Sequence, residues 1–308
     1  MKVAVIGSPG DGQTILGILE TLEAARVEAY GLKLHDSWTA LSRSQLEPHL
    51  LKATHYLLVA TEHNIASAWF VFAGGYGLGR SSGTAIYRDD PSRELPHYLS
   101  GTPVLDTLGE LASYYESEQK EWLYQEERRA ARAALLEMGI SYHADALAQC
   151  VVEGDTKAVE LFLQAGFHPD ARDKHGVTLL CLAARNKHRA VAELLLGRGA
   201  ALDLQSEDRG YSPLMDASLA GSSELVELFL AEGADSNLVS KDGQTALIVA
   251  VGRNDAQTVR SLLSYGADPD VADKLGFSAR RYATLFKKSD IVPLFESIPR
   301  RRGREAAE

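Results

Sequence analysis

Apolar residues in the first third of the chain form short continuous runs, and segments with helical spacing of apolar residues lie between these runs. The runs predict β-strands at residues 2–7, 27–32, 55–61, 83–87 and 102–105. The intervening segments predict helices at residues 13–25, 42–53 and 66–72, and a variable stretch follows at 91–99. Strands that are apolar throughout and alternate with helices favour a parallel sheet that is covered on both faces.

Five such strands joined by four crossovers predict a doubly wound, flavodoxin-like α/β domain over residues 1–112. The next segment, 113–140, is strongly charged and has neither proline nor glycine before Gly139. Because good helix formers dominate it, we predict one long linking helix. The alternative is a merely solvated spacer. The residues expected to anchor the helix are Trp122, Leu123, Leu135 and Leu136.

The second half of the chain repeats with a period of 33 or 34 residues. Two series of glycines carry this period: Gly176, Gly210, Gly243 and Gly276, and then Gly166, Gly199, Gly233 and Gly266. A hydroxyl residue stands two positions after each glycine of the first series, where it can cap the start of a short helix. These residues are Thr178, Ser212, Thr245 and Ser278. The pattern closely resembles the ankyrin repeat over about half of the chain.

This resemblance implies an all-α solenoid of about five repeats over residues 141–298, with degenerate terminal repeats that act as caps. Residues 299–308 are then expected to be a flexible basic tail. It also implies a protein partner, which most such stacks bind through variable tips and inner helices. The candidate partner-binding residues are His175, Arg185, Tyr211, Asp216, Arg253 and Tyr282. Tyr and Arg are favoured because they often dominate interfaces; for any single residue, a solvated side chain without a partner is the alternative.

The composition narrows the classes of partner. The chain has 308 residues and a formal net charge of −10, which argues against nucleic acid or an anionic membrane bound through bulk charge. Two cysteines, Cys150 and Cys181, are too few for a disulfide framework, and the scattered histidines predict no metal site. No apolar run is long enough for a membrane span or a signal peptide, so we expect a cytoplasmic protein.

A glycine turn at residues 7–12 follows the first strand and opens a helix, which is where a phosphate could bind. Its spacing is G-x-x-G-x-G, which differs from the dinucleotide-binding fingerprint G-x-G-x-x-G. Pro9 removes one N–H donor and Asp11 would repel a phosphate. Gly7 and Gly10 are therefore candidates for binding a nucleotide, with a tight structural turn as the favoured alternative.

A more specific signal follows the third strand. Residues 44–60 run from an amphipathic helix into a strand, and Ser67-Ala-Trp69 opens the next helix. Together with the segments at 96–99 and 111–115, this order resembles a bacterial Toll/interleukin-1 receptor (TIR) domain over residues 1–115. In that family a catalytic glutamate stands four residues after the tryptophan and supports cleavage of NAD. Here Ala73 occupies that position, so the resemblance implies an inactive or nearly inactive domain.

The TIR resemblance implies a second interaction surface for self-association or nucleotide sensing, at the loop after the second strand, residues 33–39. Asp36 and Trp38 are its candidate residues, also for binding NAD or a related nucleotide. We therefore expect a scaffold protein with no obligatory cofactor. The alternative is an enzyme that cleaves NAD or processes another nucleoside, in which Glu62 or Asp36 would have to replace the missing carboxylate.

Overall fold

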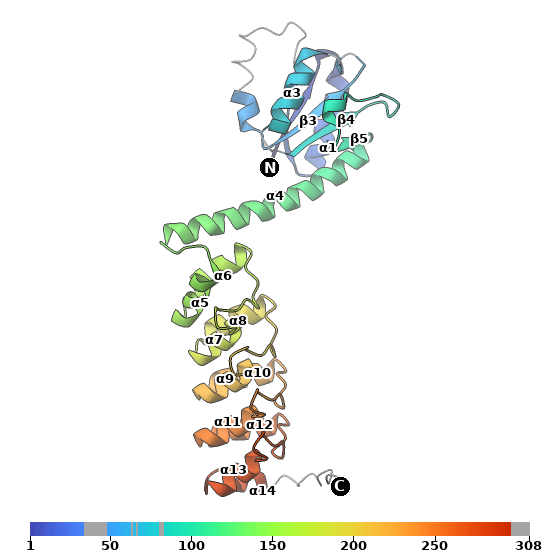
Figure 1. Cartoon of the computed structure of the whole chain (residues 1–308). Helices are drawn as coiled ribbons and strands as arrows, with labels where there is room; N and C mark the ends of the chain where they lie inside the picture. The colour runs from blue at the N-terminus through green and yellow to red at the C-terminus, as the bar shows by residue number, and fades with distance from the viewer. Residues whose placement is uncertain (34–47, 63, 66, 80–82, 297–308) are drawn as a thin grey trace. The chain divides into compact units, whose positions relative to one another are not determined.

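The computed structural model describes residues 1–33, 48–62, 64–65, 67–79 and 83–296. The chain divides into two compact units, Met1–Glu126 and Glu127–Glu308. The first unit is built on a β-sheet and the second is a stack of helix pairs (Figure 1). The domain boundaries expected after residues 112 and 140 stay predictions.

Within the described residues, the first unit holds a five-stranded sheet with the strand order β2-β1-β3-β4-β5. Every neighbouring pair of strands is parallel. The strands are β1 (Lys2–Gly7), β2 (Glu28–Lys33), β3 (His55–Ala60), β4 (Gly83–Arg88) and β5 (Val104–Leu105). This order is the flavodoxin-like one, so the predicted fold class of the first unit is confirmed.

Alternate residues of β1 face opposite sides of the sheet, as the period of two in a β-strand requires. Val3 and Val5 lie in one apolar cluster with buried residues of α1 (Gly12–Ala24). Ala4 and Ile6 lie in another with buried residues of α3 (Ala68–Gly79). Both faces of the sheet are therefore covered. Two short 3-10 turns, Pro9–Asp11 and His97–Leu99, complete the connections.

Helix α3 is longer than the sequence predicts. The sequence predicts its end at residue 72, but in the structure four glycines continue the helix although glycine is a poor helix former. Two of them, Gly74 and Gly77, bring the helix close to its neighbours, whereas a Cβ at Gly75 or Gly79 would meet nothing within 4 Å. A Cβ added at Gly77 would lie 2.7 Å from Oγ1 of Thr84, and one at Gly74 would lie 3.2 Å from Leu99. Close packing against the sheet therefore outweighs the low intrinsic propensity.

The predicted long helix is present as α4 (Leu108–Glu137), which has 30 residues. Leu111 and Tyr115 near its start are fully buried in the core of the first unit. Leu135 near its end is fully buried in the core of the repeats. Leu123 is 48% exposed and Leu136 is 75% exposed, so their predictions as anchors are wrong, whereas Trp122 is half-buried. Neighbouring residues on a helix point about 100° apart, so Leu136 turns away from the core that Leu135 faces.

The second unit consists of five helix pairs within the described residues (Figure 1). One column holds the inner helices α5 (Ala144–Glu153), α7 (Leu179–Arg185), α9 (Pro213–Ala220), α11 (Ala246–Arg253) and α13 (Ala279–Leu285). The other holds the outer helices α6 (Thr156–Gln164), α8 (Arg189–Gly197), α10 (Ser223–Ala231), α12 (Ala256–Ser264) and α14 (Val292–Glu296). This architecture confirms the predicted helical solenoid.

The predicted caps start the inner helices from α7 onward. In each case the hydroxyl oxygen accepts a hydrogen bond from the backbone N–H three residues later. The four capping residues are Thr178, Ser212, Thr245 and Ser278. The glycines of the second series, at the ends of the outer helices, have positive φ, as at Gly166 with φ of 105°. The capping residues and the glycines therefore begin and end helices at the positions that the sequence predicts.

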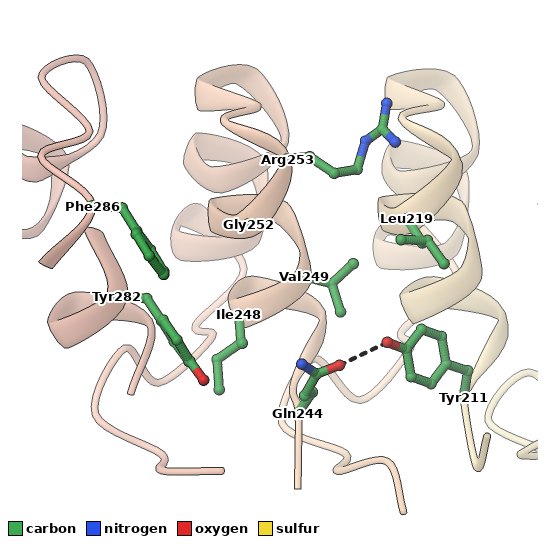
Figure 2. A pocket seen from close by; sticks show the side chains of 9 residues that line it. All are labelled: Tyr211, Leu219, Gln244, Ile248, Val249, Gly252, Arg253, Tyr282 and Phe286. Atoms are coloured by element: carbon green, nitrogen blue, oxygen red, sulfur yellow. Dashed lines mark hydrogen bonds between the residues drawn. The ribbon is translucent and has the colours of Figure 1, made fainter. Parts of the chain in front are cut away.

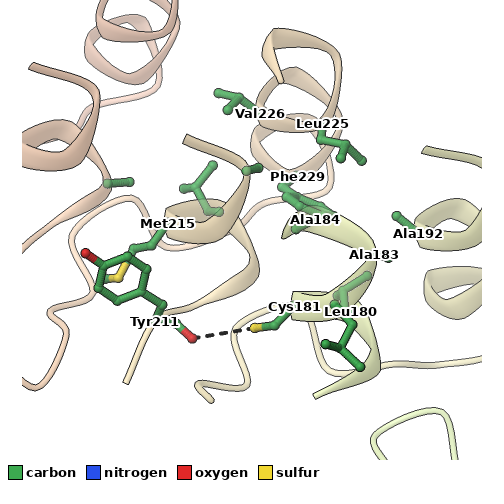
Figure 3. Packing of buried hydrophobic residues seen from close by; sticks show 14 of the residues in the cluster. Leu180, Cys181, Ala183, Ala184, Ala192, Tyr211, Met215, Leu225, Val226 and Phe229 are labelled. Atoms are coloured by element: carbon green, nitrogen blue, oxygen red, sulfur yellow. Dashed lines mark hydrogen bonds between the residues drawn. The ribbon is translucent and has the colours of Figure 1, made fainter. Parts of the chain in front are cut away.

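One continuous apolar core runs through the stack. Alanines such as Ala183 and Ala184 on α7 let the helices of neighbouring repeats approach closely, and Phe229 of α10 packs in the same cluster (Figure 3). Cys181 is fully buried there, and its Sγ lies 3.5 Å from the carbonyl oxygen of Tyr211. Burial raises the pKa of the Cys181 thiol. This thiol therefore behaves as a small core residue.

Candidate functional site

An open groove of about 350 Å³ lies on the inner helices α9, α11 and α13 (Figure 2). Its lining comes from three consecutive repeats. The nine lining residues are Tyr211, Leu219, Gln244, Ile248, Val249, Gly252, Arg253, Tyr282 and Phe286. Most of them are apolar or aromatic, which is the usual character of a surface that binds another molecule.

The floor of the groove is apolar. Ile248 and Val249 of α11 are 4% and 7% exposed, so each is held firmly by the core beneath it. On the α13 side, the rings of Tyr282 and Phe286 stack with an interplanar angle of 7° and a centroid distance of 5.8 Å. Phe286 is nevertheless 57% exposed. A large aromatic ring at the edge of an apolar groove is a typical contact for a partner.

The hollow in the groove has a specific origin. The residues nine positions after the four tip glycines are Arg185, Leu219, Gly252 and Leu285. Three of these repeats carry a long side chain at this position, whereas α11 carries glycine. A Cβ added at Gly252 would meet nothing within 4 Å. The missing side chain therefore leaves open space between Leu219 of α9 and the aromatic pair of α13.

Tyr211 closes the groove on the α9 side. Its ring is 7% exposed, and its hydroxyl donates a hydrogen bond of 2.7 Å to Oε1 of Gln244 in the next repeat (Figure 2). The guanidinium carbon of Arg209 lies 4.8 Å from the centroid of the same ring, in a cation–π arrangement. Burial raises the pKa of the Tyr211 hydroxyl, so it remains a donor at neutral pH. The residue is therefore fixed rather than mobile.

Arg253 supplies a charge at the end of the groove. Its guanidinium extends from α11 toward the C-terminal end of α9 (Figure 2). A Cβ added at Gly221, which ends α9, would lie 2.7 Å from Nη2 of Arg253. The C-terminal end of a helix carries partial negative charge and attracts such a cation. Among the residues that the structure describes, Arg253 has no hydrogen-bonded or ion-paired side chain, so its charge is available to a partner.

A second feature, the ionic cluster, lies beside the groove and consists of Arg185, Asp208, Arg209 and Asp216. Asp216 of α9 is fully buried, and its carboxylate accepts hydrogen bonds from Nε of Arg185 at 2.9 Å and from Nη2 of Arg209 at 3.4 Å. The Arg185 guanidinium also donates two hydrogen bonds, of 2.9 and 3.1 Å, to the carboxylate of Asp208. The two positive and two negative charges thus satisfy one another.

The cluster shifts the pKa values of its members. Burial raises the pKa of the Asp216 carboxyl, and the nearby Arg185 acts in the opposite direction. Burial alone would also raise the pKa of Asp208, but hydrogen bonds from Arg185 and Ser206 lower it below the ordinary value. Burial alone would lower the pKa of Arg185, and its hydrogen bonds to the two carboxylates raise it instead. Arg185 therefore stays charged at all accessible pH values.

The structure sorts the predicted partner-binding residues into three places. Tyr211, Arg253 and Tyr282 line the groove. Arg185 and Asp216 belong to the ionic cluster, and because Asp216 is fully buried its side chain cannot reach a partner. His175 is exposed on a tip outside the groove, where its backbone N–H donates to Asp173. The roles of the other five residues in binding stay predictions.

Sequence reasoning missed most of the groove. It included Leu219 among the inner-helix candidates, but it left out Gln244, Ile248, Val249, Gly252 and Phe286. A signal for them exists, because alignment of the repeats on their tip glycines places a lone glycine among long side chains at the position of Gly252. That comparison would have indicated a recess on α11.

In the first unit, the glycine turn lies at the carboxyl end of β1, beside the carboxyl end of β3. The carboxylate of Asp11 accepts hydrogen bonds of 2.6 Å from both the backbone N–H and the hydroxyl of Ser8. Asn64, which is fully buried, donates to the same oxygen at 2.8 Å. Asp11 thus occupies donors of Ser8 and Asn64 within and beside the turn, and its carboxylate would repel a phosphate there. This geometry favours the structural turn over a phosphate cradle.

The TIR-like motif lies at the start of α3. Ser67 caps the helix, because its Oγ accepts from the backbone N–H of Phe70 at 3.3 Å. Trp69 and Ala73 are each 1% exposed and pack in the apolar cluster that contains Leu58. Glu62 is exposed. Asp36 and Trp38 lie outside the described residues.

The described residues contain no group of three or more His, Cys, Asp or Glu side chains that could hold a metal ion. No helix among them is both long and apolar enough to cross a membrane.

The paired helices, capped starts and glycine-closed ends define the second unit as a stack of ankyrin-type repeats. The family model described as ankyrin repeats (3 copies) matches residues 147–240 and 214–297. An ankyrin repeat-containing protein of Treponema pallidum (strain Nichols) is 32% identical over 295 residues, which cover 96% of this chain and 99% of that protein. The chain therefore belongs to the ankyrin repeat-containing proteins.

Other relatives share only part of their length with the chain. An L-asparaginase of Dirofilaria immitis is 32% identical over 45% of this chain and 23% of its own length. The B-cell lymphoma 3 protein homolog of Mus musculus is 32% identical over 46% of this chain and 32% of its own length. This chain thus spans about a quarter to a third of these two proteins, and the ankyrin repeats support a role in protein interaction.

Proposed function

We propose that this chain is a scaffold protein that holds a protein partner in the groove on α9, α11 and α13. The observation that carries this proposal is the exposed ring of Phe286 beside the buried apolar floor of Ile248 and Val249. When a partner covers apolar side chains that are fixed in place and open to water, the free energy of the complex falls, which favours binding. The ionic cluster offers less, because its charges are already paired and a partner would have to replace good hydrogen bonds.

Photocrosslinking in cells tests this function. A benzophenone amino acid replaces Phe286 in one variant and Tyr265 in the other. These two residues are 57% and 54% exposed, but Tyr265 follows the outer helix α12. We expect discrete protein adducts from position 286 that are absent at position 265. Equal labelling at both positions, or none at position 286, would contradict the proposal.

For the first unit we propose a TIR-like domain that is catalytically inactive and serves self-association or nucleotide sensing, in a protein that works in the cytoplasm. The buried environment of Ala73 supports the inactive state, because a glutamate there would place its carboxylate among Trp69, Phe70 and Leu58. An ionised carboxylate is costly in such surroundings. The proposed scaffold therefore needs no NAD turnover.

Two measurements test the proposal for the first unit. The full chain is incubated with NAD, and we expect nicotinamide release at the level of buffer; turnover well above buffer would support the enzyme alternative instead. Light scattering over a range of concentrations reports self-association. A strictly monomeric protein, with the same melting temperature with and without NAD, would remove both the self-association and the sensing role.

A further inference from the structure

The recess over Gly252 has the form of a subsite for one bulky side chain. Its walls are Leu219 on α9 and the stacked rings of Tyr282 on α13 and of Phe286, which directly follows α13, and Val249 lies at its base (Figure 2). Glycine in a helix is less stable than alanine, so the open position is kept at some cost to the helix. Nothing in the backbone requires glycine here, since its φ is not positive.

The charges around the recess are positive. Arg253 lies on α11, and Lys287 and Lys288 follow Phe286 directly. Among the described residues, none of these three cations has a hydrogen-bonded or ion-paired side chain. Two of the carboxylates near the groove are already engaged: Asp216 is bound by two arginines, and Asp273 accepts a hydrogen bond of 2.6 Å from the Tyr282 hydroxyl. Asp242, at the tip that precedes α11, is exposed and acts on Tyr211. The positive charge is therefore concentrated where Arg253, Lys287 and Lys288 end their helices, away from the tip.

From this combination we propose that the groove binds an acidic, extended peptide segment of a protein partner. One large apolar side chain of the peptide occupies the recess over Gly252, and a neighbouring carboxylate pairs with Arg253. A planar guanidinium suits a carboxylate because it can donate two parallel hydrogen bonds. This inference rests on the proposed function and specifies the chemistry of the partner.

A basic peptide is the main competitor, since cations also bind the faces of aromatic rings. Here the aromatic pair already has cationic neighbours. The Arg281 guanidinium lies 4.3 Å from the ring centroid of Phe277, which is itself packed on Tyr282. Together with Arg253 and Lys287, it would repel an incoming lysine or arginine. Charge complementarity therefore selects the acidic segment.

Fluorescence anisotropy with three labelled peptides tests the chemistry of the partner on the full chain. The probes are Asp-Glu-Phe-Asp-Glu, the same peptide with Ala for Phe, and Lys-Arg-Phe-Lys-Arg. We expect the first to bind with a Kd at least about tenfold lower than either of the others. Its affinity should fall as salt concentration rises, because salt screens the carboxylate–guanidinium pair.

Two matched pairs of variants locate the binding site. Gly252→Leu fills the recess and should weaken binding of the first peptide at least about tenfold. Gly197→Leu places the same side chain on the outer helix α8, where a Cβ also meets nothing within 4 Å, and should leave the Kd unchanged. Arg253→Ala should weaken binding, whereas Arg260→Ala on α12 should not. Melting temperatures check that every variant is folded. If Gly252→Leu does not fold, the Kd of Gly252→Ala is measured in its place.

Three results would overturn the inference: no binding of the acidic Phe peptide at millimolar concentration, equal or tighter binding of the basic peptide, or an unchanged Kd in folded Gly252→Leu. Failure of this inference is distinguishable from failure of the proposed function. If the peptides fail while Phe286 still forms protein adducts in cells, the groove binds a partner of other chemistry. If both experiments fail, the groove is not the partner-binding surface.

Discussion

Two neighbouring regions of the inner helices are built from equivalent positions of the repeat, yet they differ in character. At the ninth position after the tip glycine, α7 has Arg185 and α11 has Gly252. At the sixth position, α9 has Asp216 and α11 has Val249. The first combination closes into the ionic cluster, in which the side chains bind one another. The second leaves an open apolar groove.

This difference shows that the repeat determines the course of the backbone, while the side chains at equivalent surface positions can differ from one repeat to the next. Buried charges that pair with one another add little net stability compared with apolar residues, but removing one partner is costly. An exposed apolar surface adds no stability until something covers it. The ionic cluster therefore has the properties of an internal structural element, and the groove has those of a binding surface.

The largest expected effect comes from breaking the ionic cluster. Asp216→Ala removes a fully buried carboxylate, one of the two that Arg185 and Arg209 share, and leaves Asp208 to pair with both arginines. We expect a loss of about 3 kcal/mol in the free energy of unfolding, measured by urea denaturation. Asp242→Ala, at an exposed tip residue, is the control and should change stability by less than about 0.5 kcal/mol. Equal effects of the two variants would refute the structural role of the cluster.

Tyr211 links the two regions, because Arg209 of the ionic cluster lies over its ring while Gln244 of the groove accepts a hydrogen bond from its hydroxyl. Tyr211→Phe keeps the ring and removes this bond, so we expect a loss of about 1 kcal/mol in unfolding free energy. Tyr265→Phe is the matched control, since the Tyr265 hydroxyl has no partner within the described residues. An unchanged free energy of unfolding in Tyr211→Phe would show that the two regions are independent.

A substitution at Gly252 in the groove is expected to raise the stability of the protein, in contrast to the two substitutions above. Gly252→Ala should stabilise the protein by about 0.5 kcal/mol, because alanine is the better helix former and its Cβ meets nothing. Gly221→Ala, one repeat earlier, should destabilise it, since Gly221 has a φ of 69° and its Cβ would approach Arg253. Thermal unfolding of both variants checks the signs. Destabilisation by Gly252→Ala would mean that the recess is part of the packed structure.

The smallest expected effect is the loss of the stabilising contribution of Asp208 at acidic pH. The pKa of Asp208 is lower in the folded chain than its ordinary value of 3.8, on account of Arg185 and Ser206. Its contribution is therefore present above that value and is lost as pH falls through it toward the folded pKa. At neutral pH, Asp208→Asn should cost about 0.5 kcal/mol, as an exposed ion pair does. The difference from the original chain should shrink when unfolding is measured from about pH 6 to about pH 3. A difference that is constant with pH would contradict the pairing.

The repeat half could be predicted closely because its signals are local. Thr178 and Ser212 are two of the four predicted caps, and each satisfies a donor at the start of its own helix. Such interactions involve residues a few positions apart, so the sequence displays them directly. The length of α3 could not be predicted, because the close approach that favours glycine at Gly77 and Gly74 depends on Thr84 and Leu99, which are distant in the sequence.

The sequence by itself determined the elements of this protein: five strands of a parallel sheet, a long helix, and helix pairs that recur every 33 or 34 residues. Only the tertiary structure decided which side chains meet. Tyr211, Gly252 and Phe286 come from three repeats and form one groove, while Asp216, which could equally have faced a partner, lies buried between two arginines. The physical reason is the separation along the chain of the residues that interact. Capping and helical periodicity involve residues a few positions apart, whereas the pairing and burial of side chains depend on neighbours that only the stacked repeats bring together.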